Sequence, residues 1–202
     1  MDINGAKAFM KEYLEKLYKK YTDIDPVLVA RPDLPEVMWA DGETPDDEEW
    51  CVWKLIPSTV TGDDIAACEK GYGIEFPNCI KAFLGTYHHC FGSPVGENMP
   101  EEPFESLDNA YNPHLAANGY LPFTWDKDGY FIRCIDLNAN DDGDSCPVVQ
   151  FDHEVLFDLQ YDFEDKGEEI PRERLEELAD RIADNFYDYL NGVYDGSIDG
   201  ND

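Results

Sequence analysis

The stretch 119–154 constrains the fold of this chain most strongly, because it alternates short apolar runs with polar turns. Three β-strands are predicted here, at residues 120–124, 130–137 and 147–151. Asp128-Gly129 and Asp142-Gly143 lie in the intervening turns, where glycine tolerates the positive φ that tight hairpin connections require. The stretch therefore predicts an antiparallel three-stranded meander, whose apolar face must be covered by other parts of the chain.

Two long amphipathic helices are predicted, one near each end of the chain. Residues 6–21 place aromatic and aliphatic side chains such as Phe9, Tyr13 and Leu17 on one broad face. Residues 171–191 keep apolar positions three or four residues apart, and a glycine follows as a stop signal. We interpret the aromatic stripe of the first helix as part of the core rather than as a ligand site.

Two shorter helices are predicted upstream of the meander. Thr61 stands three residues ahead of Asp64, which is the capping-box pattern for a helix at 63–71. Gly73 follows this helix as a C-terminal stop. Pro77 suits the first turn of the next helix, because its missing N–H is not needed there.

The remaining segments are predicted to be short strands and connections. Short strands are expected at residues 27–30, 37–40, 50–56 and 155–159. Residues 91–118 are rich in proline, glycine and asparagine, which predicts a long connection with at most a short helix. The sum is a single α+β domain, in which an antiparallel sheet meander is covered by helices.

Several short motifs of this chain are centred on Glu69, Gly73, Pro77, Pro122, Gly129, Asp136, Pro147 and His153. In their order and spacing, these motifs resemble those of the SUKH superfamily (Syd/Smi/Knr-like). The resemblance covers roughly residues 50–190 and implies structural roles for these positions. It also implies a SUKH-type domain at 50–195, preceded by a helix and proline-rich extension at 1–49 and followed by a frayed tail at 196–202.

The charge of the chain limits its partners. The formal net charge is −30, from 45 acidic and 15 basic residues. Such a surface repels nucleic acid and anionic lipid and attracts cationic partners, although acidity for solubility alone stays open as an explanation. No signal-peptide pattern and no apolar run of ~18 residues is visible, and six cysteines occur without a CxxC pair. These features predict a reduced, cytoplasmic protein without a membrane span.

Candidate chemical motifs each have a structural explanation that we favour. The zinc-like triplet His88-His89-Cys90 diverges by some 100° per residue if it is helical, and no second ligand pair accompanies it. Residues 138–143 imitate the start of an EF-hand loop, but position twelve is Val149 rather than a glutamate. A hairpin turn is therefore expected there.

Acid–base chemistry could be imagined at His153 and its acidic neighbours, with Cys134 or Cys146 as a nucleophile. No oxyanion-hole or nucleophile-elbow pattern accompanies these residues, and no phosphate-binding glycine loop is present. We expect no catalytic residue, no cofactor and no bound metal.

The SUKH resemblance implies an immunity protein that occludes a cognate protein toxin with a basic surface, of the nuclease or deaminase type. The predicted contact surface is the two meander turns, with Trp125, Asp126, Asp128, Asp141, Asp142 and Asp144. Aromatic side chains are favoured at interface centres, and carboxylates around them would supply specificity. Two alternatives remain: a regulatory scaffold, as in the fungal members, and a metal-dependent hydrolase. The sequence leaves the choice between monomer and dimer undecided.

Overall fold

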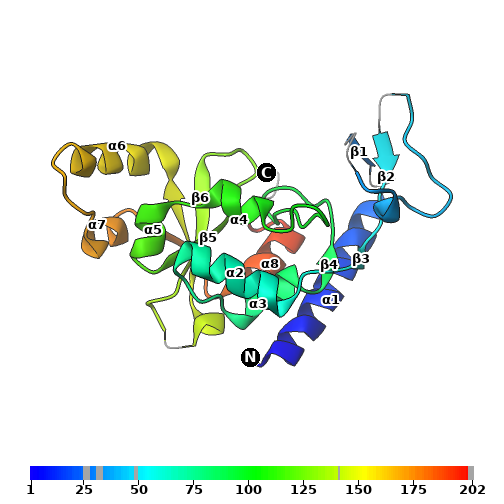
Figure 1. Cartoon of the computed structure of the whole chain (residues 1–202), viewed down its shortest axis with the longest axis horizontal. Helices are drawn as coiled ribbons and strands as arrows, with labels where there is room; N and C mark the ends of the chain where they lie inside the picture. The colour runs from blue at the N-terminus through cyan, green and yellow to red at the C-terminus, as the bar shows by residue number, and fades with distance from the viewer. Residues whose placement is uncertain (25–27, 31–33, 48–49, 141, 200–202) are drawn as a thin grey trace.

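A computed structural model describes residues 1–24, 28–30, 34–47, 50–140 and 142–199 of the chain (Figure 1). Its centre is a four-stranded antiparallel sheet in the order β5-β6-β7-β8. The sheet strands are β5 (Tyr120–Trp125), β6 (Phe131–Asp136), β7 (Val148–Asp152) and β8 (Asp180–Ala183). The longer helices are α1 (Ile3–Thr22), α2 (Gly62–Tyr72), α6 (His153–Glu164) and α8 (Phe186–Asp195). The shorter ones are α3 (Asn78–Leu84), α4 (Glu105–Ala110), α5 (Pro113–Ala117) and α7 (Arg172–Glu176). The predicted α+β class is confirmed.

The meander predicted from the sequence is confirmed, with strand boundaries that differ by one residue. The pairing of β5 with β6 matches Leu121 with Ile135, and the pairing of β6 with β7 matches Ile135 with Val148. A bulge lies between Pro122 and Thr124, where the register shifts. Proline has no N–H for the ladder, so an edge strand such as β5 is where it can be accommodated.

Helices cover both faces of this sheet (Figure 1). Side chains alternate across a strand, so Leu121 and Ile135 enter the larger core with α1, α2, α3 and α8. Tyr120 and Ile132 enter a smaller core with α5, α6 and α7. The sheet therefore separates two hydrophobic clusters, and each has its own covering helices.

The N-terminal helix is part of the larger core. α1 confirms the helix predicted at 6–21, and it buries Ala6, Met10, Leu14 and Leu17 almost completely. The aromatic stripe belongs to this packing, since Phe9 contacts Tyr187 edge-on with ring centroids 4.8 Å apart. α1 therefore completes the hydrophobic core beneath α3.

The capping box predicted at Thr61 is confirmed at the start of α2. The backbone N–H of Asp64 donates to Thr61 Oγ1, and the N–H of Thr61 donates to Asp64 Oδ2 at 2.8 Å. At the other end, Gly73 takes φ +68°, a left-handed conformation that favours glycine. Pro77 precedes α3 as its N-cap residue, one position before the first turn.

The strand predicted at 155–159 is wrong, because these residues form part of α6. Asp152 caps this helix, with its Oδ1 accepting hydrogen bonds from the N–H groups of Glu154 and Val155. The apolar residues Leu156, Leu159 and Phe163 face the smaller core at helical spacing. Residues 155–159 are therefore helical because their apolar positions follow helical spacing, and they do not continue the meander as a strand.

The single helix predicted at 171–191 is also wrong, because the chain forms α7, β8 and α8 there. Residues 180–183 pair with the open edge of β7, where Gln150 lies opposite Asp180 and Val148 opposite Ala183. Asn185 then caps α8 by accepting from the N–H of Asp188. The unpaired edge of β7 offers backbone hydrogen bonds that override the local helical pattern.

Smaller corrections concern the segments before the sheet. Residues 36–38 form the 3-10 helix η1 (Glu36–Met38) rather than a strand, and Trp39 makes a single bridge to Trp53. The strand predicted at 50–56 is split into β2 (Trp50–Val52), paired with β1 (Leu28–Ala30), and β3 (Ile56–Pro57), paired with β4 (Tyr87–His88). The connection 91–118 contains two short helices, α4 and α5. Residue 27 of the predicted strand 27–30 lies outside the described residues.

Candidate functional site

The two meander turns proposed as a contact surface lie at opposite ends of β6. Residues 126–130 join β5 to β6, whereas residues 137–147 join β6 to β7. At about 3.3 Å per residue, the six residues of β6 separate the turns by about 20 Å. The two turns therefore do not form one continuous patch.

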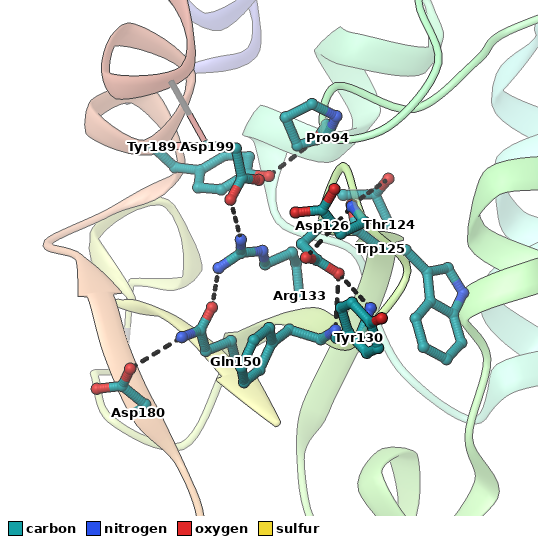
Figure 2. Close-up of polar contacts among 12 residues, drawn as sticks. Pro94, Thr124, Trp125, Asp126, Tyr130, Arg133, Gln150, Asp180, Tyr189 and Asp199 are labelled. Atoms are coloured by element: carbon teal, nitrogen blue, oxygen red, sulfur yellow. Dashed lines mark hydrogen bonds and ion pairs between the residues drawn. The ribbon is translucent and has the colours of Figure 1, made fainter. Parts of the chain in front are cut away.

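The first turn is organised by Asp126, whose side chain is buried. Its Oδ1 accepts hydrogen bonds of 2.7 Å from the N–H groups of Tyr130 and Phe131 (Figure 2). Gly129 takes φ +74°, which closes the turn. Trp125 donates its indole N–H to the carbonyl of Asn109, and Asp128 is exposed. Asp126 therefore shapes the turn from inside, and Asp128 is the carboxylate that faces solvent.

Replacing Asp126 with alanine is expected to lower the free energy of unfolding by about 2 kcal/mol, because it leaves backbone N–H groups without their acceptor. Replacing the exposed Asp128 with alanine is the matched control and should change stability by less than about 0.5 kcal/mol. Urea unfolding of both variants measures the difference. Equal unfolding midpoints for the two variants would contradict this role of Asp126.

The second turn is also fixed from inside. Asp142 caps the 3-10 helix η2 (Gly143–Ser145) by accepting from the N–H of Asp144, and its own side chain is exposed. Asp144 is buried, and its Oδ1 accepts a 2.7 Å hydrogen bond from the N–H of Cys79 at the start of α3. Asp141 lies outside the described residues. Of these acidic residues, Asp142 is the one that the structure places at the surface.

The positions that carry the family resemblance make contacts within the chain. Glu69 Oε1 accepts from the N–H of Phe76 at 2.7 Å and pairs with Lys81 at 2.9 Å, which ties α2 to α3. Asp136 accepts hydrogen bonds of 2.7 and 2.9 Å from the guanidinium of Arg172 in α7. The Glu69 contacts join α2 to α3, and the Asp136–Arg172 contact joins β6 to α7.

The two remaining prolines and the histidine of the resemblance lie in or next to the sheet. Pro122 lies beside the β5 bulge, and the carbonyl of Pro147 accepts from the N–H of Asp136. His153 starts α6, where its Nδ1 lies 3.0 Å from the carbonyl of Tyr130. Its ring packs edge-on against Trp125, with centroids 5.7 Å apart.

A polar network around the buried Arg133 links β6, β7 and β8. Arg133 on β6 is 4% exposed and donates to Gln150 and to Asp199, the latter at 2.7 Å (Figure 2). Gln150 in turn donates to Asp180 on β8 at 2.9 Å. Asp199, which the sequence analysis placed in a frayed tail, is therefore tied to the sheet, while residues 200–202 lie outside the described part of the chain.

The cysteines and histidines considered for catalysis or metal binding are either buried or hydrogen-bonded to other residues of the chain. Burial raises the pKa of the Cys134 and Cys146 thiols, which disfavours the nucleophilic thiolate. His88 uses both ring nitrogens, one 2.8 Å from Asn98 Oδ1 and the other accepting from the N–H of Thr59. Across the described residues, no three His, Cys, Asp or Glu side chains gather as a metal site would require.

The outer face of α6 is a surface that the sequence prediction missed. Phe157 and Tyr161 are each 64% exposed, while Leu156 on the opposite face is buried in the smaller core. Acidic residues with exposed side chains occupy the same outer face, at Glu154, Asp158 and Asp162. The spacing of two aromatic residues four positions apart, opposite an apolar core-facing row, was the signal that could have revealed this face. Assigning residues 155–159 to a strand concealed it.

Among the described residues, no helix combines the length and the apolar composition needed to cross a bilayer.

Comparison with known families places these features in a wider group. Residues 59–192 match the model of the SMI1 / KNR4 family (SUKH-1). No curated protein matches the chain significantly. The matched region begins just before α2 and ends within α8, so it includes the whole four-stranded sheet. SUKH-1 is a family of immunity and toxin-binding proteins that are generally non-catalytic. Since the match spans well over half of its residues, the chain belongs to the SMI1/KNR4 family (SUKH-1).

Proposed function

We propose that this chain is an immunity protein, which binds a cationic protein toxin of the nuclease or deaminase type and occludes it. The observation that carries the proposal is membership of SUKH-1 over residues 59–192 in a chain whose net charge is −30. Enzymes that act on nucleic acids use basic surfaces to hold phosphates. A strongly acidic protein complements such a surface, and the charge difference accelerates association.

The chemistry of the chain favours binding over catalysis. The buried Cys134 and Cys146 are poor nucleophiles because burial raises their pKa. His153, the candidate acid–base residue, contacts the carbonyl of Tyr130 through Nδ1 and packs on Trp125. A role in which the chain acts by occupying another protein agrees with these contacts.

We propose the cytoplasm as the place where the protein acts. All six cysteines are free thiols, as expected for a protein in a reducing compartment. An immunity protein there would meet a toxin after its delivery and before it reaches its nucleic-acid substrate.

The test is a binding and neutralisation assay with the purified C-terminal domain of the protein encoded beside this chain's gene. We expect a tight one-to-one complex that abolishes the activity of that domain and whose association rate falls as salt is added. A neighbouring domain that stays fully active and unbound would contradict the immunity role. Retention of a different host protein, mapped to the same surface, would favour the regulatory scaffold.

A further inference from the structure

The outer face of α6 carries two large aromatic side chains that do not pack in either core of the molecule. Its inner residues Leu156, Leu159 and Phe163 already fill the smaller core. Phe157 and Tyr161 point away from that core and each exposes 64% of its surface. Large aromatic side chains that a fold leaves exposed together are a common mark of a protein-binding surface.

Carboxylates accompany the aromatic pair along the whole face. Glu154, Asp158 and Asp162 follow one another at intervals of four, so they form a row along α6. Glu154 is three residues from Phe157, and Asp158 is three residues from Tyr161, so each aromatic ring has a carboxylate beside it. Within the described part of the chain, no cationic side chain forms an ion pair with these three carboxylates.

The face continues toward the first meander turn. Tyr130 is 59% exposed, and its ring stacks on His153 at the start of α6, with centroids 6.5 Å apart. Val155 is 46% exposed, and Asp128 reaches solvent from the same turn. Of the two turns suggested by the sequence, the one at 126–130 therefore adjoins α6, whereas the other lies at the far end of the sheet.

We propose that this α6 face, defined by Glu154, Phe157, Asp158, Tyr161 and Asp162, is the docking surface for a cationic protein partner. Phe157 and Tyr161 insert into the partner, and the three carboxylates face its lysines and arginines. The proposal names the contact surface of the proposed immunity function and rests on it. A second copy of this chain fits poorly, because pairing two such faces would bring carboxylates together.

The charge also argues against the other classes of occupant. Phosphates of nucleic acids and anionic lipid headgroups are repelled by a helix that carries these carboxylates. A cationic protein supplies both an apolar pocket for the rings and the opposite charge. Rings at the centre of an interface carry most of the binding energy, whereas carboxylates around them mainly set the association rate.

The experiment compares two double variants with matched controls, using the same neighbouring toxin domain as the probe. Phe157→Ala/Tyr161→Ala is expected to weaken binding about 30-fold or more. Asp158→Asn/Asp162→Asn should slow association about fivefold at low salt, with little effect at high salt. As controls outside the α6 face, Trp50→Ala removes an aromatic ring that is 42% exposed, and Glu101→Gln/Glu102→Gln removes two exposed charges. Both controls should bind as the wild type does.

A second probe keeps the surface testable if the toxin assay fails. Titrating the ¹⁵N-labelled protein with a short synthetic peptide of lysine and leucine should shift the backbone amides of α6 and of Tyr130 most strongly. Shifts confined to the acidic segment 41–47, or spread evenly over all acidic segments, would overturn the α6 proposal. If the wild type and the Phe157→Ala/Tyr161→Ala variant bind the toxin domain equally tightly, the α6 proposal is overturned and the immunity function stays intact. If the wild type does not bind that domain, the proposed immunity function is contradicted. The peptide titration then tests by itself whether the α6 face is the docking surface.

Discussion

Replacing His89 with phenylalanine is expected to remove a large part of the acid sensitivity of folding. His89 is fully buried, and within the described part of the chain neither ring nitrogen has a hydrogen-bond partner. Its ring packs between Phe83 and Phe91, with centroids 5.3 and 5.2 Å away. Burial, assisted by the nearby His88, lowers the pKa of His89 to about 3.

The direction of the pH effect follows from the two states of the imidazole. In the unfolded chain the pKa is about 6.5, so between about pH 6.5 and 3 the unfolded chain binds a proton that the folded protein does not. Stability from this group is therefore complete above about pH 6.5 and is lost as the pH falls, at about 1.4 kcal/mol per pH unit. From pH 7 to pH 4 the loss reaches about 3 kcal/mol.

Urea unfolding at a series of pH values, for the wild type and His89→Phe, measures this contribution. The many carboxylates are common to both proteins, so the difference between their curves isolates His89. The backbone hydrogen bonds between His89 and Asn98 do not involve the side chain, so the fold should survive the change. The stability of His89→Phe should rise relative to the wild type as the pH falls. Two parallel curves would contradict the buried, neutral state of His89.

Replacing Asp199 with alanine is expected to lower the free energy of unfolding by about 3 kcal/mol. Asp199 supplies the carboxylate opposite the guanidinium of Arg133, which is 4% exposed. Removing one member of a buried ion pair leaves the other charge without compensation inside the protein. Gln150 would remain as a neutral acceptor, which cannot replace the lost charge.

Two further variants separate charge from backbone conformation. Asp199 takes φ +54°, a left-handed conformation that asparagine tolerates well, so Asp199→Asn removes the charge with little strain. We expect it to lose roughly half as much stability as Asp199→Ala. Arg133→Met combined with Asp199→Ala removes both charges and should be more stable than the sum of the single changes predicts. Wild-type stability of Asp199→Ala in urea would show that the tail does not hold the sheet.

Local sequence patterns were sufficient where the chain signals its own structure. The glycine turns and apolar runs of 119–154 predicted the meander, and Thr61 with Asp64 predicted the start of α2. The periodicity of α1 predicted its buried face. In each case the deciding interactions join residues that are close in the sequence, so a short stretch contains the necessary information.

The candidate site was predicted less well, because exposure is a property of the whole fold. Asp126 and Asp128 are two residues apart in the same turn, yet one is buried and accepts backbone hydrogen bonds while the other faces solvent. Asp144 was also chosen as a surface residue, but it contacts the N–H of Cys79 at the start of α3. No pattern within the turns distinguishes the buried carboxylates from the exposed ones. Their hydrogen-bond partners lie in other elements, or come into reach only once the turn has closed.

By itself, the sequence determined the α+β class, the central meander, the family and the acidic character of the surface. Only the tertiary structure decided that residues 180–183 leave a helical pattern to pair with β7, and that Phe157 and Tyr161 of α6 remain outside the core. The physical reason is the same in both cases. A free strand edge and a filled core are produced by elements distant in the sequence, and they determine which of two locally acceptable conformations or orientations is lower in free energy.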